Sequence, residues 1–144
     1  MIVEDEHYKY SDLTHKIIGC AMSVHTYLGN GFQEVIYQRA LAYELSQANL
    51  NFVRELEVDI FYKEKPEPIG TRRVDFLVED KILIELKATS QLDENHYAQI
   101  LNYLTAYKLE IGLLINFGEK SLKFKRFIKS LENKSVESNN PYNL

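Results

Sequence analysis

The feature that most constrains the fold is the segment 74–88, with the sequence VDFLVEDKILIELKA. Apolar residues alternate through 74–78, an acidic pair interrupts them, and the alternation resumes through 82–86. A period of two is typical of β-strands, so the segment predicts a hairpin of two adjacent antiparallel strands. Side chains two apart on a strand share a face. We therefore expect Val74, Phe76 and Val78 to lie together, and Glu85 and Lys87 to point the same way.

Three charged residues stand out on these apolar strands: Asp75, Glu85 and Lys87. Two carboxylates can hold a hard cation such as Mg²⁺ while leaving positions for water and phosphate, and a nearby lysine can orient the attacking water. The pattern therefore predicts a metal-assisted phosphodiester site. The alternative is a structural ion-pair cluster, which is disfavoured because desolvation offsets much of the attraction between buried charges.

Length and charge bound the class of protein. A chain of 144 residues fits one domain with a real core, and we expect this domain to span 1–130, followed by a polar tail at 131–144. The net charge of −4 argues against a protein that coats nucleic acid through bulk positive charge, although it does not exclude a nuclease. Cys20 is the only cysteine and no apolar run reaches membrane-spanning length, so we expect a cytoplasmic protein without membrane contact.

The basic residues are unevenly spread. Arg72 and Arg73 closely precede Asp75, and a second group of cations crowds the segment 120–129. A solvated face and a nucleic-acid contact are equally consistent with this second group. The two interpretations stay open.

The periodicity of the remaining chain predicts an α/β fold. A strand, a helix and a second strand at this spacing form a crossover unit, so the strands at 82–86 and 111–117 should be parallel. The segment 122–128 is either a strand or a short helix. The expected elements are helices at 12–28, capped by Ser11 or Asp12, at 32–48, and at 94–109, capped by Asp93; strands at 52–62, 74–78, 82–86 and 111–117; and a turn at 63–70.

Several polar residues border the apolar stripes of these helices. Glu34 falls on the same side of its helix as the inward-facing Tyr37, although an acid in a first turn also complements the helix dipole. A second stripe runs beside the apolar face of the helix at 94–109, formed by His96, Gln99, Tyr103 and Tyr107. We expect His25 and His96 to be hydrogen-bonded structural residues rather than metal ligands, because Mg²⁺ prefers oxygen.

Three motifs together resemble those of the PD-(D/E)XK nuclease superfamily. Asp75 followed by Glu85-Leu-Lys87 resembles its core motif, with Val74 where a proline often stands. Gln99-Ile-Leu-Asn-Tyr103 resembles the Q-x-x-x-Y element of exonuclease-type members. Gly31-Phe-Gln-Glu34-Val-Ile-Tyr37 resembles the signature of the small bacterial GxxExxY proteins. The resemblance covers residues 11–130 and implies a restriction-endonuclease-like αβββαβ core with a central mixed sheet flanked by helices.

The resemblance also implies roles for residues. Glu34, Asp75 and Glu85 would be metal ligands for Mg²⁺ or Mn²⁺, and Lys87 the catalytic lysine, working with Glu85, Asp75 and Gln99. The expected substrate-binding residues are Tyr103, Arg73 and His96. The implied activity is hydrolysis of nucleic acid, with DNA favoured over RNA. The alternative is a non-catalytic module of the same fold that binds nucleic acid or a protein partner, and a homo-oligomer is left open.

Overall fold

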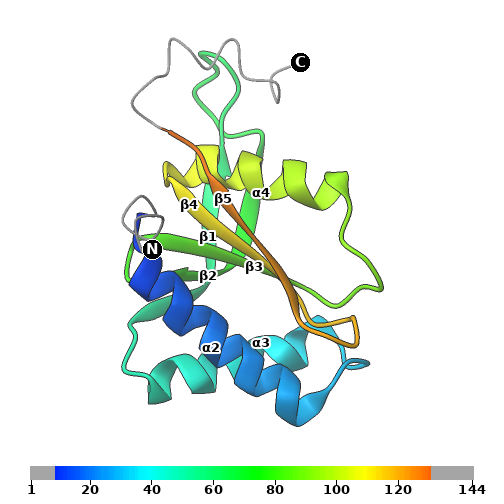
Figure 1. Cartoon of the computed structure of the whole chain (residues 1–144). Coiled ribbons are helices and arrows are strands. Elements are labelled where there is room, and N and C mark those ends of the chain that lie inside the picture. The colour runs from blue at the N-terminus through cyan, green and yellow to red at the C-terminus, as the bar shows by residue number, and fades with distance from the viewer. Residues whose placement is uncertain (1–8, 131–144) are drawn as a thin grey trace.

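The computed structural model describes residues 9–130 as a five-stranded sheet with two helices on one face and one helix on the other (Figure 1). This arrangement confirms the expected α/β class and the restriction-endonuclease-like layout. The predicted tail, 131–144, lies outside the described residues. The elements are α2 (Ser11–Leu28), α3 (Glu34–Gln47), β1 (Phe52–Ile60), β2 (Gly70–Val78), β3 (Ile82–Lys87), α4 (Glu94–Tyr107), β4 (Ile111–Asn116) and β5 (Lys123–Ile128).

The sheet is mixed, with strand order β1-β2-β3-β4-β5. Its first three strands pair antiparallel, as the hairpin pattern predicts. β3 and β4 pair parallel across the crossover helix α4, which confirms the predicted crossover unit. The undecided segment 122–128 forms an antiparallel edge strand, β5. None of the helices within residues 9–130 is long and apolar enough to cross a membrane.

Each face of the sheet carries its own apolar core. Ile84 and Leu86 of β3 point toward α2 and α3, where they meet Tyr37 and Leu41. Leu83 of the same strand points the other way and packs beneath α4. β3 and β4 are therefore covered on both faces, as expected for a parallel pair in the centre of a sheet.

The expected cap of the first helix is wrong. Ser11 already belongs to α2, and the residue at the cap position is Tyr10, whose left-handed backbone has φ 60° and whose side chain makes no capping hydrogen bond. Thr14 instead donates both its backbone N–H and its hydroxyl to the carbonyl of Tyr10. The side chain of Thr14 thus supports the first turn from inside the helix.

The expectation that Val74, Phe76 and Val78 share a face is also wrong. Phe76 and Val78 pack in the core beneath α2 and α3, whereas Val74 packs in the core beneath α4. The change of face occurs at Asp75, which pairs with neither neighbouring strand in the ladder, and Glu55 opposite it has φ 52°. The β1–β2 hairpin bends here, and Figure 1 shows its outer end extending past α4. β2 consequently parts from β3 beyond Phe76.

Candidate active site

Asp75 and Glu85 meet at the point where β2 and β3 separate. The last ladder pair is Phe76 with Ile84. Beyond it, Leu86 donates its backbone N–H to Asp75 Oδ2 at 2.7 Å, and Asp75 donates its own N–H to Glu85 Oε1 at 3.4 Å. Side-chain carboxylates therefore replace the missing ladder bonds and are held close together by the two diverging strands.

Glu85 occupies an unfavourable environment for a carboxylate. Its side chain is buried, at 9% exposure. The pKa of Glu85 is raised to about 8, chiefly by burial and then by the negative charge of Asp75, while the positive charge of Lys87 partly offsets the rise. The ionised form of Glu85 thus lacks sufficient compensation from the protein, and a bound cation would supply it.

Lys87 lies beside this pair and is held by α4. Its Nζ donates to Gln99 Oε1 at 3.1 Å. The position of Gln99 depends on how α4 begins, because Asp93 caps the helix as predicted and His96 completes a capping box with it. In that box the Nδ1 atom of His96 accepts the backbone N–H of Asp93 at 3.1 Å. His96 therefore has the structural role expected of it, and its predicted contact with a substrate stays a prediction.

The turn between α2 and α3 carries the G-x-x-E-x-x-Y motif and explains its spacing. Gly31 has φ 112°, which strains any residue with a side chain. Tyr37 is fully buried, and its ring stacks on that of Phe117 with 4.6 Å between the centroids. The hydroxyl of Tyr37 donates a hydrogen bond to the carbonyl of Gly29 at 2.6 Å and accepts one from the N–H of Phe32 at 3.2 Å. Tyr37 thus fixes the turn that begins α3, and Glu34 is the first residue of that helix.

Glu34 joins the group electrostatically from the other face of the sheet. The residue is exposed rather than buried within the inward stripe. Desolvation of its carboxylate nevertheless raises its pKa, as does the charge of Asp75, while Lys87 and a hydrogen bond from the backbone of Ala88 lower it. The structure therefore brings Glu34 near Asp75 and Lys87, although its role as a metal ligand stays a prediction.

The predicted substrate-binding residues divide into two groups. Tyr103 lies in the site, where burial and then the charge of Glu85 raise its pKa to about 12, with Arg72 acting in the opposite direction. Arg73 points elsewhere, because its Nη2 atom lies 3.3 Å from Glu57 Oε2 in an exposed ion pair. The arginine whose charge reaches Tyr103 is Arg72. Alternation along β2 separates the two arginines, since neighbouring residues on a strand face opposite sides.

Two residues that were not predicted from the sequence support Asp75. Gln38, which is 4% exposed, donates to Asp75 Oδ1 at 2.7 Å. Its carbonyl oxygen accepts from Arg54 Nη2 at 3.0 Å. Gln38 follows Glu34 by four residues and therefore shares its helix face. That spacing is the signal that could have identified Gln38, whereas nothing in the sequence pointed to Arg54.

The tips of β3 and β4 are locked together by one amide. Asn116 is fully buried, and its Oδ1 atom accepts the N–H groups of Thr89 and Gly118. Its Nδ2 atom donates to the carbonyl of Thr89 and to Glu119 Oε2. Gly118 has no room for a side chain, since a Cβ atom there would lie 2.3 Å from the Thr89 oxygen. The chain that leaves Lys87 is therefore fixed to the end of β4.

The donor atoms in the site suit a hard divalent cation. Within residues 9–130, no three His, Cys, Asp or Glu side chains stand close enough together to form a ready-made ligand set. Asp75 and Glu85 offer two carboxylates, and Mg²⁺ is commonly held by one or two carboxylates with the remaining positions taken by water and phosphate. The buried, poorly compensated charge of Glu85 is the observation that favours a cation there.

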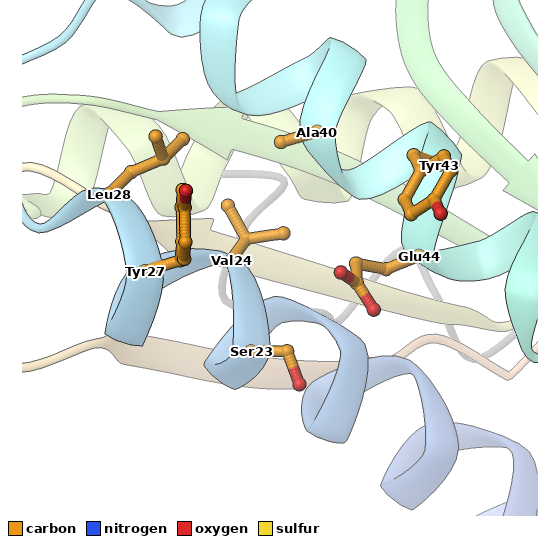
Figure 2. A pocket seen from close by; sticks show the side chains of 7 residues that line it. All are labelled: Ser23, Val24, Tyr27, Leu28, Ala40, Tyr43 and Glu44. Carbon is orange, nitrogen blue, oxygen red and sulfur yellow. The ribbon is translucent and has the colours of Figure 1, made fainter.

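A separate groove of about 390 Å³ lies between α2 and α3 (Figure 2). Its lining is mostly apolar, and Glu44 is the carboxylate at its edge. It contains none of the residues described above. The lining residues are Ser23, Val24, Tyr27, Leu28, Ala40, Tyr43 and Glu44.

Comparisons with known proteins agree with this fold. The sequence profile of the PD-(D/E)XK nuclease superfamily matches residues 11–127. No curated protein matches the chain by sequence. Among solved structures, one titled "Crystal structure of SSO0001" is similar, with a TM-score of 0.55 and 19% identity over 70% of this chain. This chain spans about half of that other chain, 52% of its length, and at 19% identity the similarity concerns the fold alone. On the match to the superfamily profile, this chain belongs to the PD-(D/E)XK nuclease superfamily.

Proposed function

We propose that the protein is a metal-dependent nuclease that hydrolyses phosphodiester bonds, with DNA as its substrate, and that it belongs to the GxxExxY branch of the superfamily. The observation that carries the proposal is the meeting of Asp75 and Glu85 where β2 leaves β3, with Lys87 beside them. A purely structural cluster would gain little from this arrangement, because burial penalises the Glu85 charge more than Lys87 relieves it.

In the proposed mechanism, Asp75 and Glu85 would hold Mg²⁺ or Mn²⁺, and Glu34 would join them as the third ligand only once the ion is present, since the three are not grouped in the metal-free protein. When bound, the ion supplies an activated water and neutralises charge on the phosphate. Lys87 orients the attacking water through its ammonium group, and Gln99 limits the positions that this group can adopt. Arg72 and Tyr103 border the site and would contact the phosphate and sugar on either side of the scissile bond.

The test is a cleavage assay on labelled single-stranded and duplex oligodeoxynucleotides, with Mg²⁺, with Mn²⁺ and with EDTA. We expect metal-dependent cleavage by the wild-type protein and none by Asp75→Asn or Glu85→Gln, since each substitution removes a ligand charge. Including an RNA oligonucleotide decides between the two polymers. If the wild-type protein cuts none of them with either metal, the proposal is wrong, and a non-catalytic module that binds nucleic acid or a protein becomes the better account.

We further propose that this activity operates in the cytoplasm. Cys20, the single cysteine, is buried as a free thiol, and this supports a reducing compartment.

A further inference from the structure

The last strand of the sheet is strongly basic in an otherwise acidic protein. The whole chain carries a net charge of −4, yet the segment 120–130 contains five cations and no acid. Four of them are lysines, and none of these four forms an ion pair with any residue in the described range 9–130. Uncompensated positive charge is therefore concentrated on one edge of the sheet. The lysines are Lys120, Lys123, Lys125 and Lys129.

Two of these lysines face the same side of the sheet as the candidate active site. Phe127 of β5 packs in the core beneath α4, and alternation places Lys123 and Lys125 on that same side. The Nζ atom of Lys125 lies 5.6 Å from the ring centroid of Tyr97 in α4, which agrees with this direction. Both lysines are exposed. Their ammonium groups are accordingly available on the α4 side.

The register of the sheet aligns these lysines with the catalytic candidates. Glu85 pairs with Leu114, and Leu114 pairs with Lys125, so the three residues form one row across β3, β4 and β5. Lys87 and Lys123 end the next row, with Asn116 between them. Two strand spacings amount to about 10 Å. That distance corresponds to about three nucleotides along one DNA strand, at about 3.4 Å per nucleotide.

We propose that Lys123 and Lys125 form a phosphate-binding edge for the nucleic acid substrate. While one phosphodiester bond of a strand lies at Asp75 and Glu85, these lysines hold the backbone phosphates of the same strand nearby. The inference rests on the proposed function, and it adds the path that the substrate takes across the protein. Acidic side chains at the cleavage site repel the polyanion, so affinity must come from cations elsewhere on the same face. The edge recognises phosphates and no base, so binding at this edge does not depend on sequence.

The competing explanation is that the lysines only protect an exposed edge strand from pairing with other molecules. The two explanations differ in a measurable way. Cations that neutralise phosphates release counterions, so each one contributes about 0.7–0.9 to the slope of log affinity against log salt. Lysines that only discourage aggregation contribute nothing to that slope.

The experiment measures fluorescence anisotropy of a fluorescein-labelled single-stranded oligodeoxynucleotide over a series of NaCl concentrations, in EDTA so that no cleavage occurs. We expect the Lys123→Gln/Lys125→Gln protein to bind about tenfold more weakly at physiological salt and to lose about 1.4 from the slope, the value for two phosphate contacts to a single strand. The Lys123→Arg/Lys125→Arg protein should retain both the wild-type affinity and the wild-type slope. The matched control is Lys16→Gln/Lys81→Gln, which makes the same change in net charge on α2 and the β2–β3 turn.

The inference is overturned if the Lys123→Gln/Lys125→Gln variant binds like the wild type. It is also overturned if Lys16→Gln/Lys81→Gln weakens binding equally, because the effect would then reflect net charge. Thermal melts establish that each protein is folded. If the double variant is not, the two single variants, Lys123→Gln and Lys125→Gln, replace it, and each should remove about 0.7 from the slope. Cleavage is assayed separately with Mg²⁺. If the protein binds through Lys123 and Lys125 but cuts no substrate, the proposed nuclease activity is wrong and the proposed phosphate-binding edge stands. If the variant without these lysines binds and cuts like the wild type, the phosphate-binding edge is wrong and the nuclease activity stands.

Discussion

Gln38 Nε2 donates a hydrogen bond of 2.7 Å to Asp75 Oδ1, which joins the second turn of α3 to the first acid of the candidate site. Gln38→Leu should lower metal-dependent cleavage by about 10–100-fold, the usual effect of removing a partner that orients a metal ligand. The concentration of Mg²⁺ at half-maximal activity should rise in parallel, a change that loss of stability alone would not produce. Gln47→Leu, at the exposed end of the same helix, is the control and should leave both quantities unchanged.

Lys87→Ala should leave metal affinity nearly intact, or slightly increased, because a competing positive charge has gone. Cleavage should fall by about 10²-fold or more, the scale expected for one preorganised electrostatic group. Lys87→Arg should not restore activity, because a planar guanidinium cannot take the place of a compact ammonium beside water. Single-turnover cleavage together with a calorimetric Mg²⁺ titration separates the two quantities. Wild-type cleavage rates in Lys87→Ala would refute the assigned role.

Glu85 should make the metal-free protein less stable as the pH rises. The folded protein raises the pKa of Glu85 from 4.5 to about 8, so below pH 4.5 the residue is protonated in both states. Between these values the unfolded chain loses the proton and the folded protein keeps it. The free energy of unfolding should therefore fall by at most about 1.4 kcal/mol per pH unit across this window and then level off.

Urea unfolding in EDTA over a pH series tests this dependence. Glu85→Gln should flatten the decline and stabilise the protein at the alkaline end. Glu64→Gln, in the exposed turn between β1 and β2, should leave the decline as it is in the wild type. An identical pH profile for Glu85→Gln and wild type would show that Glu85 ionises normally.

Mg²⁺ should raise the melting temperature through preferential binding to the folded state. At a free concentration of about 100 times Kd, the gain in unfolding free energy is about 2.7 kcal/mol. Asp75→Asn and Glu85→Gln should abolish the shift, and Lys87→Ala should preserve it. Differential scanning fluorimetry with Mg²⁺, Mn²⁺ and EDTA provides the measurement, and a wild-type protein that does not respond to millimolar metal would contradict metal binding.

Tyr37→Phe should destabilise the protein by about 1–3 kcal/mol, since it leaves the carbonyl of Gly29 without its 2.6 Å hydrogen bond. It should also reduce cleavage, because the same turn positions Glu34. Tyr43→Phe makes the same chemical change at a side chain that is 62% exposed, and its stability should not differ from that of the wild type. Chemical denaturation of both variants compares the two sites directly.

The strand at 82–86 was predictable because Ile82, Ile84 and Leu86 recur with a period of two, although the residues between them are buried as well. The direction of Glu85 and Lys87 followed from the same two-residue period. The change of face at Asp75 was not predictable in this way, because it depends on a local break in two ladders that no periodicity records. Arg73 was consequently placed in the site in preference to Arg72. Arg54 was missed for a related reason: its partner, Gln38, lies on a different element, and only the folded chain brings them together.

The amide of Asn116 has a consequence for the thermodynamics of ligand binding. Because it holds Thr89, Gly118 and Glu119 at once, the segment that follows Lys87 has already lost its conformational freedom in the free protein. Ordering such a segment after a ligand arrives would cost about 1–2 kcal/mol of backbone entropy per residue. Here that entropy is given up during folding. A metal ion or a phosphate that reaches the end of β3 therefore meets a surface whose shape is set before the encounter.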